Sequence, residues 1–430
     1  MTTLVLGAGV SGLGAARLLR RLDRPFEVYD EHAAGILEGA PIASGPWDPA
    51  YLIGIDRVIT SPGFPETSRP IHDALAEGIE VRSELDLAAS FIEADLVAVT
   101  GTNGKTTTTE LVDAMARHGG MASAAAGNIG TALSDLAATG TNLDVVAVEA
   151  SSFQLRFAAS LHPRVAVVLA VTADHLDWHG SAAAYRSAKA RIVEHQEADD
   201  VVVYDADDPG ATEIAEGAPA RRVPISATAA PDDGHGRRGD SLVIGELAVP
   251  VGELAVTDAA YLTDLAAAGA AALAIGVDQT AIEATIRSFR PGAHRRRLVT
   301  VHGGVAWVDD SKATNPHAAG AAIAAYDAVV LIAGGRNKGL DLSPLVEAPN
   351  VRAVLAIGEA SSELGSLAPH LVEEVGDLTA AVRRAAAIAR PGDTVLLAPG
   401  CASFDQYPSY AARGDAFAAA VADVTQEETA

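Results

Sequence analysis

The sequence predicts an α/β fold made of parallel sheets covered by helices. Two glycine-rich turns, at residues 7–14 and 100–107, each follow a short apolar run and precede a helical segment. Further apolar, β-branched runs alternate with helical segments along the rest of the chain. This order is typical of doubly wound sheets, and 430 residues accommodate two or three such domains.

Composition excludes several classes of partner. The net charge of −25 repels duplex nucleic acid and anionic membranes, so we expect neither a nucleic-acid partner nor membrane insertion. The longest alanine-rich stretch, 265–277, is too short to span a bilayer. The single cysteine, Cys401, allows no intrachain disulfide, and the first residues lack the basic region of a signal peptide. We therefore expect a cytoplasmic protein that acts on small molecules.

The first glycine-rich turn matches the dinucleotide-binding pattern. Residues 7–12 read G-x-G-x-x-G, and the next apolar run, 26–29, ends at Asp30. Such glycines accept a pyrophosphate at the helix N-terminus, and the acidic residue binds a ribose. The ligand stays open between NAD, FAD, another nucleoside diphosphate, and no ligand at all. The turn at 61–63 follows a further strand of the same sheet, and we place a first domain at residues 1–92.

The second turn has the composition of a phosphate-binding loop. Lys105 and Thr106 stand between an apolar strand at 96–99 and a helix at 110–118. Backbone N–H groups of such a loop hold phosphates, the lysine reaches the outer phosphates, and the hydroxyl binds Mg²⁺. The first glycine of the usual pattern falls on Val99, so an ordinary strand-to-helix turn is the alternative.

Two further strand ends carry polar side chains beside this loop. The apolar runs 145–148 and 165–171 end at Glu149 and at DHLDWH, which contains His175. Acidic and imidazole groups in this position suit a Mg²⁺·ATP site.

The rest of the second domain is predicted from its turn residues and helical patterns. Residues 206–256 are predicted to be loop-rich, and helices are predicted at 259–275 and 280–289. An Arg-Pro-Gly linker at 290–292 then ends a domain that we place at 93–290.

The third domain, 291–430, alternates strands and helices again. Its apolar runs, each followed by a polar or glycine-rich turn, are 305–308, 328–333, 351–357 and 394–397. A basic cluster, HRRR at 294–297, stands out in an acidic chain, although a solvated charge run is the alternative.

Lysine is rare in this chain. Of 31 basic residues only four are lysines, namely Lys105, Lys189, Lys312 and Lys338. Lysine is a compact point charge and a primary amine that can be modified covalently. Because one lysine stands in the phosphate loop, the other three are candidate functional residues, with scattered surface lysines as the alternative.

Together these motifs resemble the Mur ligase family, ATP-dependent amide-forming enzymes that build the peptide stem of peptidoglycan. The resemblance rests on TGTNGKTT at 100–107, GNIG at 127–130, EASSFQL at 149–155, DHLDWH at 174–179, YRSAKARI at 185–192, HR at 294–295 and DDSKATNP at 309–316. Four runs are similar to those of the members that add D-glutamate to UDP-N-acetylmuramoyl-L-alanine, namely SSFQL, DSKATN, GGRNKG and APGCASFDQYPSYAARGDAF. The implied fold has a Rossmann-like N-terminal domain, a central P-loop NTPase-like domain and a C-terminal Rossmann-like domain, and we expect a monomer.

The resemblance implies ATP, two Mg²⁺ ions and a CO₂-derived carbamate on Lys189 as cofactors. The residues implied for ATP are Gly101, Thr102, Asn103, Gly104, Lys105, Thr106, Thr107, Arg295 and Asp310. Those implied for Mg²⁺ are Thr106, Glu149, His175 and Lys189. The implied catalytic residues are Lys105, Glu149, His175, Lys189 and Lys312.

The resemblance also implies substrate contacts and a reaction. The implied substrate-binding residues are Val10, Ser11, Asp30, Ser61, Pro62, Gly63, Asn128, Thr314, Lys338, Ser403 and Tyr410, of which the last is commonly phenylalanine in the family. The L-alanine carboxylate would attack the γ-phosphate of ATP, and the amine of D-glutamate would attack the resulting acyl phosphate. Domain closure about linkers near residues 92 and 290 is implied as well.

One stretch departs from the family. The His-Asn pair and the later asparagine that help to hold adenine correspond here to Ala260-Tyr261 and Asp264. The alternatives are another Mur ligase with a different amino-acid acceptor, a catalytically silent nucleotide-sugar-binding homologue, and an NAD-linked oxidoreductase. The last would leave the phosphate loop without a purpose.

Overall fold

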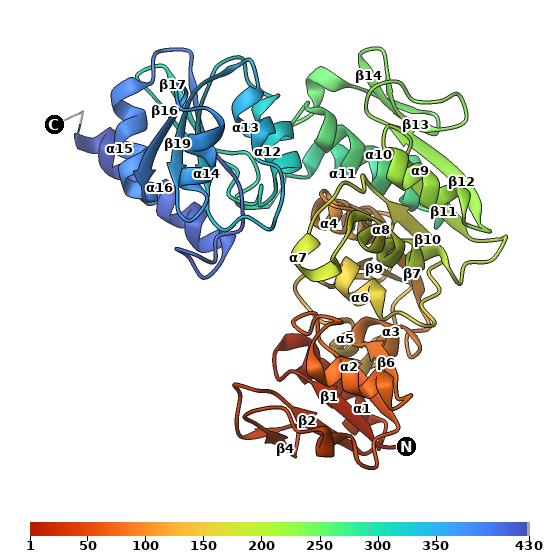
Figure 1. Ribbon diagram of the computed structural model, residues 1–430. Helices are drawn as coiled ribbons and strands as arrows, with labels where there is room; N and C mark the ends of the chain where they lie inside the picture. Colours follow the sequence, from red (N-terminus) through yellow and green to blue (C-terminus); the bar gives the residue numbers. More distant parts are fainter. Residues whose placement is uncertain (291, 428–430) are drawn as a thin grey trace. The chain divides into compact units, whose positions relative to one another are not determined.

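A computed structural model describes residues 1–290 and 292–427 (Figure 1). The chain divides into two compact units. The first contains residues 1–172 and 178–289, and the second contains residues 173–177 and the chain from Arg290 onward. Strands and helices alternate through both units, which confirms the predicted α/β class.

The first sheet of unit 1 has the strand order β3-β4-β2-β1-β5-β6. Its strands are β1 (Thr3–Leu6), β2 (Phe26–Tyr29), β3 (Ile36–Leu37), β4 (Ala40–Ala43), β5 (Arg57–Thr60) and β6 (Glu80–Ser83). Its helical segments are α1 (Val10–Arg21), η1 (Pro49–Leu52), α2 (Arg69–Ala76) and α3 (Glu84–Ala89). Because β2, β1 and β5 run parallel, the turns that follow them lie at one edge of the sheet.

The second sheet of unit 1 has the order β15-β14-β13-β12-β11-β10-β7-β9-β8. Its strands are β7 (Asp95–Thr100), β8 (Ser123–Gly127), β9 (Val145–Glu149), β10 (Val165–Val168), β11 (Val201–Asp205), β12 (Arg221–Ser226), β13 (His235–Arg238), β14 (Ser241–Ile244) and β15 (Leu247–Pro250). The strand β7 pairs in parallel with β9 and β10, so its carboxyl end lies between theirs.

Helices cover both faces of this second sheet. They are α4 (Lys105–His118), α5 (Leu133–Thr139), α6 (Ser152–Arg156), α8 (Ala182–Ala190), η2 (Arg191–Val193), α9 (Pro209–Glu216), η3 (Val251–Glu253), α10 (Ala259–Ala274) and α11 (Gln279–Ser288), while α7 (Leu176–His179) begins within 173–177. The alanine-rich α10 is largely buried against α4 and the sheet. Its start is fixed by Asp258, whose carboxylate accepts a hydrogen bond from the N–H of Tyr261.

One hydrophobic cluster joins the two sheets of unit 1. It contains Leu18 of α1, Leu133 of α5 and Val146 of β9. This shared core explains why residues on both sides of the proposed boundary at 92 form one compact unit. The boundary itself stays a prediction.

Unit 2 contains a third sheet, of order β16-β17-β21-β18-β19-β20. Its strands are β16 (Arg297–His302), β17 (Val305–Asp309), β18 (Val329–Gly334), β19 (Val351–Ile357), β20 (Val372–Gly376) and β21 (Thr394–Gly400). Its helices are α12 (Pro316–Ile323), α13 (Ser343–Glu347), α14 (Ser361–Leu367), α15 (Leu378–Ile388) and α16 (Tyr410–Glu427). Separate hydrophobic clusters pack on the two faces of this sheet, as expected of a doubly wound domain.

The prediction that residues 206–256 are loop-rich is wrong. This region forms α9 and the strands β12 to β15, the last two as an antiparallel extension of the second sheet. Leu242, Ile244 and Val249 alternate inward and pack in the same cluster as residues of α10. The strands are short and their turns are rich in glycine and aspartate, so the sequence pattern alone resembled a loop.

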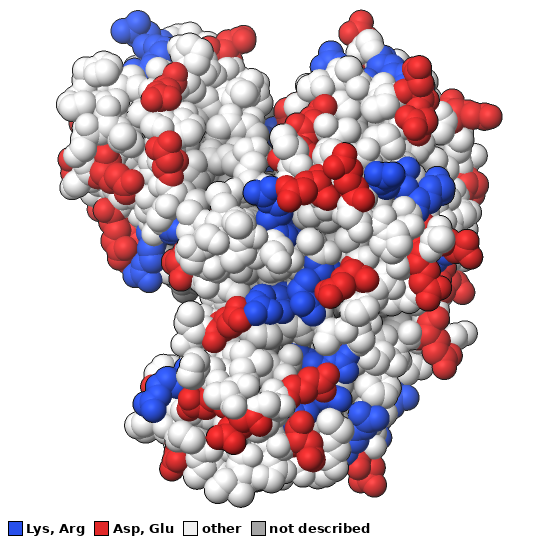
Figure 2. Space-filling view, turned by 45° about the vertical axis from the view of Figure 1, so that its right-hand side comes forward, with Lys and Arg blue, Asp and Glu red and all other residues white. Residues whose placement is uncertain are grey.

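On the face shown in Figure 2, Lys and Arg side chains lie among Asp and Glu side chains, with uncharged surface between them. In the described part of the chain, no helix combines the length and apolar character needed to cross a membrane.

Candidate active site

The phosphate loop connects β7 to α4, as the sequence predicts. Gly104 caps α4 with φ of +80°, and a Cβ added there would lie 2.1 Å from Asp264 Oδ1. Gly101 has φ of +149°, and an added Cβ would lie 2.6 Å from the Leu169 Cβ. Glycine is therefore required at both positions, and the loop brings its backbone close to the helix N-terminus where an anion is stabilised.

Two of the rare lysines meet at this loop. Lys105 Nζ donates to the carbonyl oxygens of Gly101 and Thr102 at 3.0 and 2.9 Å. Lys189 Nζ, from α8, donates to the same Gly101 oxygen at 2.7 Å. Because both bond one oxygen, the two Nζ atoms lie within about 6 Å of each other, where like charges repel.

Lys189 is held in a buried position. Its side chain is 1% exposed, and its Nζ lies 4.7 Å from the centroid of the Tyr185 ring. The Tyr185 hydroxyl is 3.1 Å from Thr102 Oγ1, which also donates to the Thr172 carbonyl at 2.8 Å. These contacts tie α8 to the phosphate loop, so the structure brings Lys189 to the site although nothing in the helical pattern at 182–193 required it.

Glu149 presents a buried carboxylate at the end of β9. Its side chain is 3% exposed, and Oε1 accepts a hydrogen bond from Asn128 Nδ2 at 2.9 Å. Oε2 has no hydrogen-bond partner among the described residues. A buried carboxylate oxygen without a donor is suited to a cation, and Thr106 in the first turn of α4 supplies a hydroxyl of the kind that binds Mg²⁺ in phosphate loops.

Other cation ligands do not gather in a ready-made cluster. Within residues 1–290 and 292–427, no group of three or more His, Cys, Asp or Glu side chains has the arrangement to hold a metal ion.

The first glycine-rich turn is tightly built around Asp30. Its Oδ2 accepts the N–H of Ala8 at 2.8 Å, and Oδ1 accepts those of His32 and Ala33 at 2.9 Å. Although burial opposes the change, these backbone hydrogen bonds lower the pKa of Asp30. At Gly12 an added Cβ would lie 1.8 Å from the Gly7 oxygen, so the α1 N-terminus closes directly on the turn.

The other predicted residues of the N-terminal turns lie at the same sheet edge. Ser61 Oγ donates to the Leu6 carbonyl at 2.7 Å, next to Pro62 and Gly63. Val10 is 66% exposed at the start of α1, with Ser11 beside it. An exposed apolar side chain and a helix N-terminus at one edge suit an extended nucleotide ligand.

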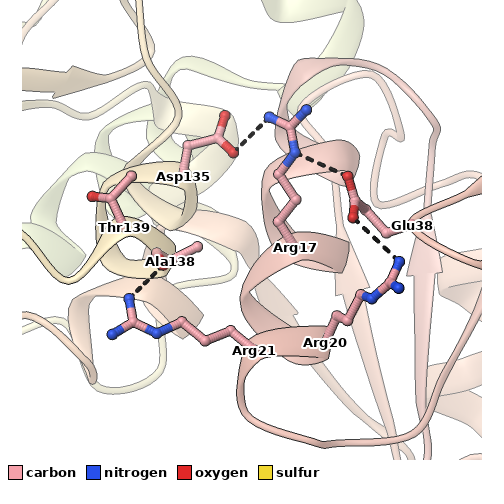
Figure 3. Close-up of a pocket in the computed structure, with 7 residues that line it drawn as sticks. All are labelled: Arg17, Arg20, Arg21, Glu38, Asp135, Ala138 and Thr139. Atoms are coloured by element: carbon pink, nitrogen blue, oxygen red, sulfur yellow. Dashed lines mark hydrogen bonds and ion pairs between the residues drawn. The ribbon is translucent and has the colours of Figure 1, made fainter.

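A hollow of about 500 Å³ is lined by residues of α1, residues of α5 and Glu38, and none of its lining residues belongs to these loops (Figure 3). Arg17 bridges Glu38 at 3.0 Å and Asp135 at 3.1 Å, while Arg21 donates to the Ala137 carbonyl at 3.1 Å near the end of α5. Since the guanidinium groups drawn there are directed to carboxylates and carbonyls of the protein, we assign the hollow to the contact of α1 with α5 rather than to a ligand.

In unit 2, Lys338 contacts an acidic residue from DHLDWH. Lys338 Nζ lies 2.7 Å from Asp174 Oδ1, and Asn315 Nδ2 donates to Asp174 Oδ2 at 3.1 Å. Burial opposes ionisation of Asp174, but the charge of Lys338 and then of His175 lowers its pKa. His175 adopts φ of +51°, an uncommon value for a non-glycine residue.

The remaining residues predicted to act on the incoming amino acid lie on loops of unit 2. Lys312 Nζ lies 5.3 Å from the centroid of the Tyr410 ring, and Thr314 follows in the same loop. Ser403 is buried after β21. The structure thus brings Lys312 and Tyr410 together, from segments almost one hundred residues apart.

The basic cluster at 294–297 is only partly a solvated run. His294 Nδ1 lies 2.7 Å from Asp309 Oδ2, and both residues are buried. Asp310 Oδ1 accepts the N–H of Arg296 at 3.3 Å. Burial raises the pKa of Asp310 to about 6, against the opposing charges of Arg296 and Arg295.

Sequence reasoning missed several polar residues at these positions. Four residues that flank predicted ones in DHLDWH, DSKATN or HRRR are not among the predicted site residues: Asp174, Asn315, Asp309 and Arg296. Asp264, at the predicted adenine position, accepts from Thr108 Oγ1 at 3.4 Å and so lies beside the phosphate loop. The one signal in the sequence that could have found these residues is that each lies next to a residue of a recognised motif.

Known proteins are similar to this chain over nearly its whole length. Three family models match: a Mur ligase MurD-like N-terminal domain at residues 1–83, a Mur ligase middle domain at 99–238, and a Mur ligase glutamate ligase domain at 268–401. A UDP-N-acetylmuramoylalanine--D-glutamate ligase from Frankia casuarinae is 44% identical, covering 98% of this chain and 94% of its own. One from Mycolicibacterium smegmatis is 39% identical, covering 97% and 96%.

Solved structures share the fold at low identity. MurF from Acinetobacter baumannii superimposes with a TM-score of 0.62 at 16% identity, covering 96% of this chain and 98% of its own. The UDP-N-acetylmuramate-alanine ligase MurC from Thermotoga maritima gives 0.59 at 16%, with both chains fully covered. Because a relative that is 44% identical covers nearly the whole chain and three Mur ligase family models match it, the chain belongs to the Mur ligase family.

Proposed function

We propose that this protein is an ATP-dependent ligase that joins D-glutamate to UDP-N-acetylmuramoyl-L-alanine through an amide bond. The observation that carries the proposal is near full-length similarity, at 44% identity over 98% of the chain, to a relative named for that reaction. The phosphate loop with Lys105, and the buried Glu149 carboxylate beside Asn128, support ATP-driven chemistry.

The reaction proceeds in two steps. The terminal carboxylate of the substrate attacks the γ-phosphate, which forms an acyl phosphate and releases ADP. The amine of D-glutamate then attacks the acyl carbon, the bond from carbon to the phosphate oxygen breaks, and phosphate and one proton leave. Both steps concentrate negative charge, so positioning and cations dominate catalysis.

We assign the phosphates to unit 1. Lys105 and the N–H groups entering α4 hold the β- and γ-phosphates. One Mg²⁺ ion would be held by Thr106 and Glu149, and a second by His175 and Lys189; both ions would supply further charge neutralisation. For Lys189 we propose a carbamate, because this change replaces repulsion between the two neighbouring ammonium groups by attraction.

We assign the acceptor amino acid to unit 2. Thr314, Lys338, Ser403 and Tyr410 bind D-glutamate, and Lys312 stabilises the acyl phosphate. Because Lys338 already contacts the Asp174 carboxylate, the side-chain carboxylate of D-glutamate must share or displace this contact.

We assign the uridine diphosphate to the first sheet of unit 1. It is bound by Val10, Ser11, Asp30 and the turn at 61–63.

Phosphate release tests the proposal. The protein is incubated with Mg·ATP and UDP-N-acetylmuramoyl-L-alanine, and D-glutamate is compared with L-glutamate, L-lysine and L-alanine. We expect release with D-glutamate alone, and none from Lys105→Met. Release with another amino acid would move the acceptor assignment, and no release with any of them would favour a catalytically silent homologue.

A further inference from the structure

The guanidinium of Arg413 is buried among uncharged acceptors. This residue of α16 is 1% exposed. Its Nε donates to Ser311 Oγ at 3.0 Å and its Nη2 to the Ser311 carbonyl at 3.0 Å, while Nη1 and Nη2 both donate to the Cys401 carbonyl at 3.2 Å. Burial lowers the pKa of Arg413 to about 10. A cation without a carboxylate in its hydrogen-bond set is costly to bury, so this one calls for an explanation.

The acceptors of Arg413 stand on the segments that carry the proposed D-glutamate contacts. Ser311 precedes Lys312 and Thr314 in one loop. Cys401 precedes Ser403 in a second loop. Two short stretches of backbone therefore hold one guanidinium between them.

The same network reaches the other two proposed contacts. Ser311 Oγ donates to the carbonyl of Tyr410 at 2.8 Å, at the start of α16. A Cβ added at Gly335 would lie 3.2 Å from Arg413 Nη1, which places the loop leading to Lys338 against the guanidinium. That loop is also paired with the second one, because the N–H of Arg336 donates to the Ala402 carbonyl at 2.9 Å.

We propose that Arg413 is a positioning residue for the amino-acid acceptor, which sets the spacing of the four segments that bind D-glutamate. This inference rests on the proposed function. The planar fork of arginine donates to two separate segments in a fixed geometry, which the single ammonium of lysine does not reproduce. The buried positive charge also favours the approach of a dicarboxylate to this part of unit 2.

A role in folding alone predicts a different outcome. If Arg413 only stabilised the fold, its loss would lower the melting temperature and the fraction of active enzyme, but the folded fraction would bind D-glutamate normally. If it positions the acceptor loops, the KM for D-glutamate rises while the KM for UDP-N-acetylmuramoyl-L-alanine, assigned to unit 1, does not.

Steady-state kinetics with the full chain separate these roles. The variants are Arg413→Lys, Arg413→Met and Ser311→Ala, each with its thermal unfolding curve. Arg384→Met is the matched control, because Arg384 lies on the surface of the same unit and pairs with Glu373 at 2.7 Å. We expect Arg413→Lys to raise the KM for D-glutamate about tenfold, the loss of roughly one charged hydrogen bond, and Ser311→Ala to raise it less.

Every outcome decides the inference. An unchanged KM for the acceptor in Arg413→Lys, or an equal rise in both KM values, would overturn it. If neither Arg413 variant folds, Ser311→Ala decides in the same way. A wild-type protein that prefers another amino acid would overturn the proposed acceptor only, and the KM for that amino acid would then test Arg413; a wild type that uses none would overturn both.

Discussion

Glu84 is expected to make the stability of unit 1 depend on pH. This first residue of α3 is 1% exposed, and its Oε1 accepts the N–H of Ser134 at 2.7 Å. Its Oε2 has no hydrogen-bond partner among the described residues. Burial raises the pKa of Glu84 from 4.5 to about 7, with hydrogen bonding from Ser134 opposing and the charge of Asp135 adding to the rise.

The sign and size of this pH dependence follow from the linkage between proton binding and folding. A raised carboxyl pKa means that the folded chain holds the proton more tightly than the unfolded chain does. The stability from protonated Glu84 is therefore present below pH 4.5 and is lost as the pH rises through about 7. At 1.36 kcal/mol per pKa unit, ionisation of Glu84 lowers the free energy of unfolding by about 3 kcal/mol above pH 8, relative to the protonated state. At pH 5 the decrease is below about 1 kcal/mol.

Glu84→Gln removes this loss because an amide does not ionise. Its oxygen still accepts from Ser134, so we expect the variant to be more stable than the wild type by about 3 kcal/mol at pH 8.5 and nearly equal at pH 5. Urea unfolding followed between pH 5 and 8.5 measures the difference. Glu77→Gln, an exposed carboxyl at the end of α2, is the control. A difference that stays constant with pH, or a destabilised variant at pH 8.5, would refute the reasoning.

Three further predictions concern the site. Lys189→Arg should abolish turnover with an unchanged thermal transition, since a guanidinium does not form the carbamate; near-normal phosphate release would contradict it, and ¹³C-bicarbonate NMR should lose the carbamate signal. Glu149→Gln should raise the Mg²⁺ concentration for half-maximal activity by about tenfold or more, measured by titration at saturating ATP; an unchanged midpoint would remove Glu149 from the metal site. Asp30→Asn should raise the KM for the nucleotide substrate about tenfold and leave the KM for D-glutamate unchanged. The asparagine NH₂ group would either face the Ala8 N–H, donor against donor, or take the place of the oxygen that accepts from His32 and Ala33. Equal changes in both KM values would argue against a local role of Asp30.

Local structure was largely predictable. The turns at 7–14 and 100–107 join strands to helices in the structure as in the pattern, because glycine, apolar runs and helix starts act over a few residues. The prediction for the region 206–256 is wrong because its strands depend on packing with distant residues rather than on local pattern. Its strands β13, β14 and β15 are too short to show a period of their own, and residues of β14 and β15 pack in the cluster that contains α10.

The sequence by itself determined the α/β class, the two glycine-rich turns between strand and helix and, through its rare lysines and family motifs, the residues to examine. Only the tertiary structure decided which of them meet. It brought Lys189 to the same carbonyl as Lys105, Asp174 to Lys338, and Arg413 to the Ser311 loop 102 residues away as well as to Cys401, 12 residues away. Such contacts depend on how sheets and helices pack at long range, and burial then sets the charge state of groups such as Glu84 and Asp310, which no local pattern contains.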